Sequence, residues 1–385
     1  MLTCLFFQPS INGHFLEYLH HEYMASSLNE TNNFVFVVPS SLKELQDGLE
    51  WPSIKNAVLV YLTNNEYLKC NQPSAIKRSI AQSRIIRRYC KLYKADHCFL
   101  NNLVLAMPLL PFYLPHGCKA SGILYGIYRW NVGQLSRGKL YFNRLIYKLY
   151  SKRLFFKKVY LLNDYESAEY FNKRFNTDTF SYLPDPINIS KEYVPQDGIR
   201  ESLGITQNDT VYLQLVIQQR KHPFEILDAI KLMSKEQLED KVFIFVGVIE
   251  ESIKDKFLKE VEQLRPKVRI VLKTGRVPFK TIYDLFYISN YCFALYDNSN
   301  MSSGVLGYAS YFNTSVIGVS HGLLGYLIKQ NYLGVCIKEI TSENVCSAII
   351  KKEKLIENSK YKDENTVENF TNVIMSNFKN KDLCL

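Results

Sequence analysis

Short apolar runs alternate with amphipathic segments along most of the chain. In the first half, the apolar runs predict buried strands at residues 2–7, 33–39, 56–63, 97–100, 119–128 and 158–164. The segments between them predict helices at residues 14–25, 41–49, 74–94 and 140–155, and a proline-ended helix up to residue 114. Strands that are apolar on both faces and separated by helices pair in parallel, because the crossover helices cover the sheet.

The same alternation restarts after a break at Leu183–Ile187. This segment reads LPDPI, and two prolines around an aspartate allow neither a helix nor a central strand to continue. Further strands are predicted at residues 210–217, 241–247, 268–275, 291–296, 314–319 and 334–338. Further helices are predicted at residues 223–233, 251–264, 279–288, 304–311, 323–329 and 343–352. A last helix at residues 364–378 has an apolar stripe that suits packing against another part of the chain.

The pattern therefore predicts an α/β protein with two Rossmann-like, doubly wound domains that face each other across a cleft. We expect the first domain at residues 1–184, the second at 185–362, and a C-terminal helix within 363–385 that returns to the first domain. In doubly wound sheets, ligands bind beyond the carboxyl ends of the strands. The pattern alone allows a nucleotide-using transferase or epimerase, a two-lobed binding protein or a dehydrogenase. The first strand is not followed by G-x-G-x-x-G, which counts against a dinucleotide enzyme.

Charge is distributed unevenly between the two halves. The chain carries a formal net charge of +10, and the whole excess lies in residues 1–183, with 22 basic and 12 acidic residues. Such a field attracts phosphates or an anionic surface. The predicted helix at residues 140–155 alternates basic and aromatic side chains. It is either an amphipathic domain helix with a solvated basic face or a segment that docks on an anionic membrane.

Location and metal content follow from the remaining composition. The N-terminus has no basic leader, and the longest apolar stretch, residues 103–115, is short and contains three prolines. We therefore expect a cytoplasmic protein, soluble or peripheral on the inner face of the membrane. The nine cysteines lack C-x-x-C spacing and the histidines lack ligand spacing to them, so we expect buried thiols and no metal site.

The segment Asn298–Gly325 carries the clearest chemical motif. It contains Ser302, Ser303 and Gly304 at the predicted start of a helix, after a loop that follows a strand. One of the serines is expected to cap this helix, and the glycine lets a ligand approach the backbone. Because a helix N-terminus presents free N–H groups and partial positive charge, it favours a phosphate; the alternative is an ordinary capped helix.

This segment resembles the donor-binding region of GT-B fold glycosyltransferases, of the retaining group 1 or family-four kind. In that family, an Arg-Lys-Gly stretch after the first strand of the second domain holds the donor diphosphate. The similar stretch here places Arg220 and Lys221 at those positions, with His222 where glycine is usual. The resemblance therefore implies a diphosphate site formed by these two bases together with Ser302, Ser303 and Gly304.

The chain departs from the family at two acidic positions. The family's glutamate pair, which contacts the sugar and the ribose, falls on Asn300 and Tyr308, which are our candidates for those contacts. Tyr308 is also consistent with core packing. The basic residue usual before the diphosphate stretch is absent, with Leu215 near its place. The resemblance implies a divergent, retaining enzyme that needs no cofactor and no essential metal, and it assigns no catalytic residue.

The first domain contributes weaker candidates. Gly13 and His14 follow the first strand and Tyr125 ends the fifth, so all three can lie on the cleft side, although a structural role suits each. We expect a glycosyltransferase that moves a sugar from a UDP- or GDP-type donor to a glycan or lipid-linked acceptor in surface polysaccharide or glycoconjugate synthesis. The alternatives are an epimerase of the same fold, a non-catalytic sugar- or nucleotide-binding protein and, from the basic first half, a nucleic-acid-binding protein.

Overall fold

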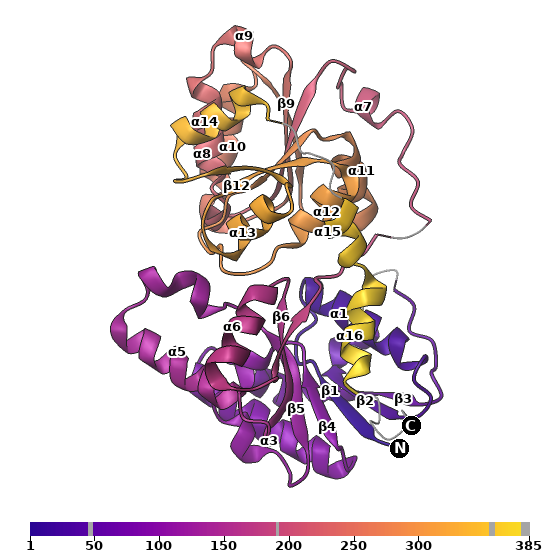
Figure 1. Cartoon of the computed structure of the whole chain (residues 1–385). Coiled ribbons are helices and arrows are strands. Elements are labelled where there is room, and N and C mark those ends of the chain that lie inside the picture. The colour runs from indigo at the N-terminus through magenta and orange to yellow at the C-terminus, as the bar shows by residue number, and fades with distance from the viewer. Residues whose placement is uncertain (45–48, 190–191, 354–358, 379–385) are drawn as a thin grey trace. The chain divides into compact units, whose positions relative to one another are not determined.

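The fold was obtained as a computed structural model, which describes residues 1–44, 49–189, 192–353 and 359–378 (Figure 1). The chain forms two compact units, each with its own parallel sheet. The first unit combines Met1–Pro184 with Val367–Leu385, and the second is Asp185–Thr366. The two doubly wound α/β domains predicted from the sequence are confirmed, and each is described by itself below.

The first domain is built on a seven-stranded parallel sheet in the order β3-β2-β1-β4-β5-β6-β7. The order reverses between β1 and β4, which is the topological switch of this sheet. Its strands are β1 (Thr3–Phe7), β2 (Asn33–Pro39), β3 (Ala57–Leu62), β4 (His97–Leu100), β5 (Lys119–Leu124), β6 (Phe156–Leu162) and β7 (Phe180–Leu183).

Helices cover both faces of this sheet, so a central strand such as β1 is apolar on both sides. Along β1, Leu5 and Phe7 belong to one buried cluster, while Cys4 and Phe6 belong to another, as the two-residue period of a strand requires. The α-helices are α1 (His14–Ser26), α2 (Asn64–Cys70), α3 (Ala75–Leu92), α4 (Leu110–Tyr113), α5 (Arg137–Tyr150) and α6 (Tyr165–Phe175). The 3₁₀ turns are η1 (Ser40–Glu44), η2 (Leu103–Ala106) and η3 (Tyr128–Gln134).

The C-terminal helix α16 (Val367–Ser376) packs back on the first domain, as predicted (Figure 1). The ring of Phe370 lies 4.9 Å from that of Tyr18 on α1. The two residues that follow the helix, Asn377 and Phe378, are also buried. Phe378 is fully buried against Phe6, and its carbonyl accepts a hydrogen bond of 3.0 Å from Asn32 Nδ2. Residues 367–378 therefore contribute to the first domain's core.

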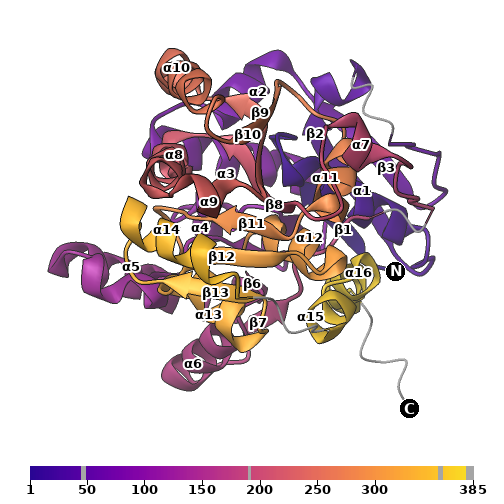
Figure 2. The ribbon, with the colours of Figure 1, turned by 90° about the horizontal axis from the view of Figure 1, so that it is seen from above.

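The second domain has a six-stranded parallel sheet in the order β10-β9-β8-β11-β12-β13, with its switch between β8 and β11. Its strands are β8 (Thr210–Ile217), β9 (Lys241–Ile249), β10 (Arg269–Thr274), β11 (Tyr291–Ala294), β12 (Ser315–Val319) and β13 (Gly334–Ile337). Helices α8 (Pro223–Leu232), α10 (Lys254–Leu264) and α14 (Ser342–Lys351) lie on one side of the sheet, and α11 (Phe279–Ile288) and α12 (Gly304–Phe312) lie on the other (Figure 2).

The α-helices of this domain are α7 (Ile199–Ser202), α8 (Pro223–Leu232), α9 (Lys235–Leu238), α10 (Lys254–Leu264), α11 (Phe279–Ile288), α12 (Gly304–Phe312), α13 (Gly322–Gln330), α14 (Ser342–Lys351) and α15 (Ser359–Glu364). The 3₁₀ turns are η4 (Gln219–Lys221) and η5 (Glu251–Ile253).

The structure differs from the predicted elements in a few places. The proline-ended helix up to residue 114 is two short pieces, η2 and α4, and the helix at 41–49 is a 3₁₀ turn whose following residues, 45–48, lie outside the described part. The sequence patterns did not predict α6 and β7. In the described part of the chain, the cysteines are free thiols and all but Cys336 are buried. No described helix is long and apolar enough to cross a bilayer.

Candidate functional site

The predicted diphosphate residues follow the two strands that border the switch of the second sheet. β8 and β11 are paired neighbours, with Tyr291 opposite Tyr212. Arg220 and Lys221 lie on η4, directly after β8, and the loop after β11 leads into α12. A backbone hydrogen bond of 3.1 Å from the Asp297 N–H to the Arg220 carbonyl joins the two segments. The structure thus brings together two segments that are about 80 residues apart, at the edge where doubly wound sheets bind ligands.

A strained residue shapes the end of β8. Val216 has φ 57°, a left-handed conformation that is rare for a β-branched side chain, and the register with β9 shifts between Leu215 and Ile217. The opposite residue, Gly247, also has positive φ, and a Cβ there would lie 3.3 Å from Val216 Cα. The bulge leaves the Leu215 carbonyl to accept a hydrogen bond of 3.1 Å from Lys221 Nζ. Strain of this kind, about 1–3 kcal/mol per residue, is common at functional sites.

Lys221 is held in place by its surroundings. Its side chain is 8% exposed, and Nζ lies 5.2 Å from the centre of the Tyr296 ring. Burial, reinforced by the neighbouring Arg220, lowers the Lys221 pKa to about 8. Arg220 is exposed, and within the described residues neither base forms an ion pair with a carboxylate. The pair therefore consists of one exposed and one buried base.

Tyr296 links Lys221 to the start of α12. Tyr296 Oη and Ser303 Oγ are 3.2 Å apart, so one ring contacts both the cation and the first turn of the helix. Ser303 occupies the N-cap position, but its side chain makes no capping hydrogen bond, which corrects the prediction of a side-chain cap. Ser302 donates its hydroxyl to Asp185 at 2.8 Å, so it ties α12 to the proline-rich segment. Neither contact could be predicted from the local sequence pattern.

His222 shows why the family's glycine position tolerates another residue here. It has φ 55°, a left-handed conformation that glycine adopts freely and histidine more readily than most side chains. Its Nε2 lies 2.7 Å from Asp297 Oδ1, and its Nδ1 lies 3.0 Å from Glu225 Oε1. The ring links the η4 turn, the first turn of α8 and the loop after β11. A sequence search for polar residues directly after buried strands would have found Asp297.

The two candidates for sugar and ribose contacts occupy different surroundings. Asn300 lies in the loop before α12 and is 9% exposed. Its backbone N–H donates a hydrogen bond of 3.2 Å to Asn298 Oδ1. Tyr308 lies in the second turn of α12, where its ring packs against Phe286 at 5.4 Å and Tyr283 at 5.7 Å. Tyr308 therefore has a clear packing role, and Asn300 is the one beside the predicted diphosphate residues.

In the first domain, the three predicted residues lie at the carboxyl edge of the sheet. Gly13 has φ 61° and precedes α1, which begins with His14. The His14 ring lies 5.7 Å from that of Tyr125, which follows β5, and 5.0 Å from that of Tyr18. The structure thus brings His14 and Tyr125 together.

The same edge holds a buried carboxylate that the sequence did not single out. Glu22 of α1 is 0% exposed, and its Oε2 accepts a hydrogen bond of 2.8 Å from Asn101 Nδ2, just after β4. Burial raises the Glu22 pKa well above its usual value, and the Asn101 bond opposes that rise only in part. Its place on an apolar helix face was the available sequence signal.

Comparison with known proteins identifies the fold. No protein-family model matches the chain. No curated protein matches it in sequence either. Solved structures do match over nearly the whole chain. WaaG, a glycosyltransferase involved in lipopolysaccharide biosynthesis, is 15% identical with a TM-score of 0.61, covering 97% of this chain and 95% of WaaG.

Two further structures match over a similar length. Anabaena HepE, solved with UDP and glucose, is 13% identical with a TM-score of 0.63, covering 98% of this chain and 99% of its own. A UDP-N-acetylglucosamine 2-epimerase from Listeria monocytogenes, named as putative, is 11% identical with a TM-score of 0.62, covering 98% and 95%. At such identities the likeness shows the fold alone.

Proposed function

Because the chain has the GT-B glycosyltransferase fold, we propose that it transfers a sugar from a UDP- or GDP-type nucleotide sugar to a glycan or lipid-linked acceptor. We place the reaction in surface polysaccharide or glycoconjugate biosynthesis, with retention at the sugar. The observation that carries the proposal is the cationic pair Arg220–Lys221 beside the start of α12, at the switch of the second sheet.

The proposed chemistry rests on the leaving group. As the glycosidic bond breaks, negative charge grows on the nucleoside diphosphate, and donors fixed in advance stabilise that charge most effectively. Lys221 Nζ is fixed by the Leu215 carbonyl and the Tyr296 ring, so it needs little reorganisation. Arg220 can reach the second phosphate as a planar donor, and the free N–H groups of the first turn of α12 add partial positive charge.

We propose that this set of positive groups takes the role that a divalent metal has in other transferases, so that no cofactor and no essential metal is needed. Adding EDTA should then leave turnover unchanged within about twofold. Loss of activity on chelation, restored by Mg²⁺ or Mn²⁺, would contradict this part of the proposal.

For the acceptor we propose the first domain, with His14 and Tyr125 as its contacts. A lipid-linked acceptor also suits the surface of α5. Three apolar side chains of this helix, Tyr141, Phe142 and Leu145, are 64%, 56% and 47% exposed. Basic residues flank this stripe, as Arg144 does, and between Glu66 and Asp164 the single acidic residue is Asp96. Exposed aromatic and basic residues on one helix favour an anionic membrane surface.

Vesicle co-sedimentation tests the membrane contact. The full chain should bind vesicles that contain phosphatidylglycerol and not vesicles of phosphatidylcholine alone. The double variant Tyr141→Ser/Leu145→Ser should lose this binding, whereas Ile76→Ser, at an exposed apolar position on α3, should keep it. Equal binding by both variants would remove α5 from the proposal.

The central proposal is tested by calorimetric titration with UDP and with GDP, followed by product analysis. We expect a dissociation constant below 1 mM for one of the two. With the matching donor sugar, NMR of the product should show the same anomeric configuration as the donor. Absence of binding to both nucleotides overturns the proposal, and an inverted product overturns retention alone.

The likeness to an epimerase and the loss of the family's glutamates keep two other functions in view. An epimerase would convert the donor sugar without any acceptor, which NMR of the nucleotide sugar alone would show. A non-catalytic binding protein would bind the nucleotide sugar and leave it intact under every acceptor condition. Nucleic-acid binding gains no support, because the exposed bases of the first domain accompany no recognition motif.

A further inference from the structure

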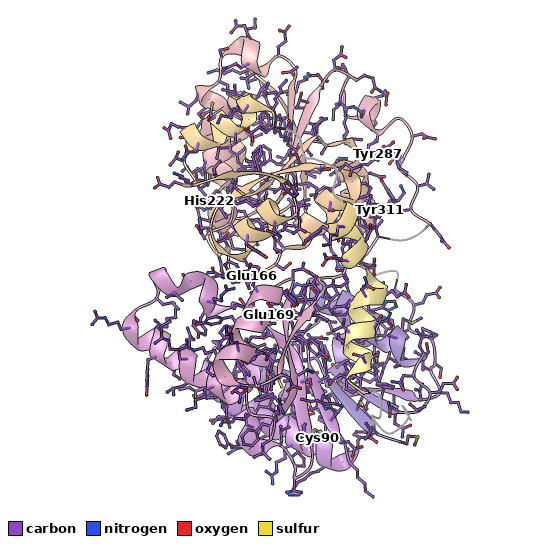
Figure 3. The ribbon with its side chains drawn as sticks, in the orientation of Figure 1. Cys90, Glu166, Glu169, His222, Tyr287 and Tyr311 are labelled. Atoms are coloured by element: carbon purple, nitrogen blue, oxygen red, sulfur yellow. The ribbon has the colours of Figure 1, made fainter. Side chains whose placement is uncertain are left out.

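Seven aromatic residues gather on one surface of the second domain, away from the residues assigned to the diphosphate. We call this the tyrosine surface; it is formed by Tyr193, Phe279, Tyr283, Tyr287, Tyr308, Tyr311 and Phe312. They come from the segment after the proline-rich break and from α11 and α12. Tyr287 and Tyr311 both lie on the side of the domain that carries these two helices (Figure 3).

Some rings of the tyrosine surface pack against one another, and others are exposed to solvent. The Tyr193 ring meets Tyr283 edge-on at 5.4 Å and Phe312 edge-on at 5.7 Å, which fixes the rings against one another. Tyr287, Phe279 and Tyr311 are 56%, 47% and 42% exposed, so rings remain available to a ligand. Exposed aromatic side chains that adjoin a rigid aromatic cluster indicate a binding surface rather than scattered surface residues.

The charges within the surface cancel locally. Lys280 Nζ lies 3.3 Å from Asp284 Oδ2 and 5.5 Å from the centre of the Tyr193 ring. Tyr193 donates its hydroxyl to Asp284 Oδ1 at 2.7 Å, and burial together with this bond raises the Tyr193 pKa. The cation and the anion of the surface therefore pair with each other. This contrasts with α5, where the exposed aromatic residues accompany unopposed bases.

We propose that the tyrosine surface binds an uncharged oligosaccharide. The proposal rests on the proposed function and adds a second contact for the glycan acceptor or product. The C–H faces of pyranose rings are apolar and stack on aromatic rings, while the exposed phenol groups can exchange hydrogen bonds with sugar hydroxyls. Within the described residues that form the tyrosine surface, Lys280 and Asp284 pair with each other, which suits a neutral glycan better than an anionic lipid or a nucleic acid.

The position of the surface suits a long acceptor. Tyr311 lies eight residues after Ser303 on the same helix, which corresponds to about 12 Å along the helix axis. That is roughly the length of two to three sugar residues. A glycan held at Tyr311 and Tyr287 would therefore stay attached to the domain that binds the donor while shorter acceptors would not.

Saturation-transfer NMR and calorimetry test this binding on the full chain, without nucleotide, using maltohexaose, cellohexaose and chitohexaose as probes. At least one probe should bind with a dissociation constant of about 1 mM or below. Tyr287→Ala/Tyr311→Ala should weaken that binding at least tenfold. Tyr287→Phe/Tyr311→Phe keeps the rings and should weaken it by no more than about threefold. Tyr332→Asn, which removes a tyrosine that is 62% exposed elsewhere in the domain, should change nothing.

The outcomes separate this proposal from the proposed function. UDP and GDP titrations of the same variants should match the unmodified chain, so a glycan result and a nucleotide result can fail independently. The proposal is overturned if no probe binds, or if the alanine pair binds as well as the unmodified chain. A change in oligomeric state in the alanine pair, with unchanged glycan binding, would instead make this surface a contact between copies of the chain.

Discussion

The switches of the two sheets each hold a buried ionisable group, and they hold it in opposite ways. At the second switch, Lys221 is 8% exposed, forms no ion pair with a carboxylate among the described residues, and has its Nζ 5.2 Å from the centre of the Tyr296 ring. At the first, Glu22 is 0% exposed, and within the described part its hydrogen-bond donor is Asn101. Burial lowers the pKa of Lys221 and raises the pKa of Glu22, so it favours the neutral form of each side chain. In the proposed function an anionic ligand stabilises the charged form of Lys221, whereas no ligand is proposed for Glu22.

The largest expected effect concerns nucleotide binding by Lys221. Lys221→Ala removes a charged donor that is already in place, and we expect UDP or GDP affinity to fall about 100-fold, close to 2.7 kcal/mol. Calorimetry measures it. Lys267→Ala removes an exposed lysine of the same domain and should change affinity by less than twofold. Equal affinities for the two variants would contradict a role of Lys221 in nucleotide binding.

The second prediction concerns the effect of Glu22 on the stability of the first domain. Because the folded pKa is raised, ionisation destabilises the fold increasingly as the pH rises above the unfolded value near 4.3. Glu22→Gln removes that penalty, so the first domain should gain about 2 kcal/mol of unfolding free energy at pH 8 and little at pH 4. Both tryptophans, Trp51 and Trp130, belong to this domain, so their fluorescence in urea reports on it selectively.

A second buried glutamate provides the control for that measurement. Glu66 forms an ion pair with Arg88, accepts a hydrogen bond from Tyr89 and completes the capping box of α2 with Thr63. Glu66→Gln should therefore lower stability at pH 8 by about 1–3 kcal/mol, opposite in sign to Glu22→Gln. Destabilisation by both variants would show that Glu22 is ionised and satisfied in the fold.

The pH dependence of nucleotide binding sharpens the comparison further. A diphosphate binds the charged form of Lys221, whose pKa is about 8, so affinity should fall about tenfold between pH 7 and pH 9. Arginine stays charged over this range, so Lys221→Arg should bind with a flat profile, whatever its absolute affinity. Parallel slopes for the two proteins would place the titrating group elsewhere.

The smallest expected effect concerns Tyr296. Tyr296→Phe keeps the ring over Lys221 and removes the contact with Ser303, so we expect nucleotide affinity to fall about threefold. Tyr296→Leu removes the ring as well and should weaken binding more, about tenfold. If Phe and Leu behave alike, the ring does not position the lysine.

Much of the fold was predictable because its strands are buried on both faces. β1 and β9, for example, appear as uninterrupted apolar runs with helices on each side. The missed pieces have weaker signals. β7 is four residues long, and the capping of α6 by Asp164 depends on a single hydrogen bond to the Ser167 N–H. The split between η2 and α4 follows from prolines, whose effect on one continuous pattern is ambiguous without tertiary contacts.

The candidate site was predictable in its residues and not in its construction. Arg220 and Lys221 follow a strand, which local pattern reveals. Their unequal burial depends on the bulge at Val216, where the chain adopts a conformation that valine rarely takes. The Tyr296 contact and the Ser302–Asp185 bond join segments far apart in sequence, and no local propensity encodes them. Such tertiary exceptions to local rules are typical of functional sites.

The return of α16 has a consequence for biosynthesis. Residues 367–378 complete a domain whose residues 1–184 leave the ribosome before the second domain is made. Until they arrive, a hydrophobic gap beside Phe6 stays open, and the nascent first domain waits as an incomplete intermediate. A segment translated after the second domain thus closes the core of the first.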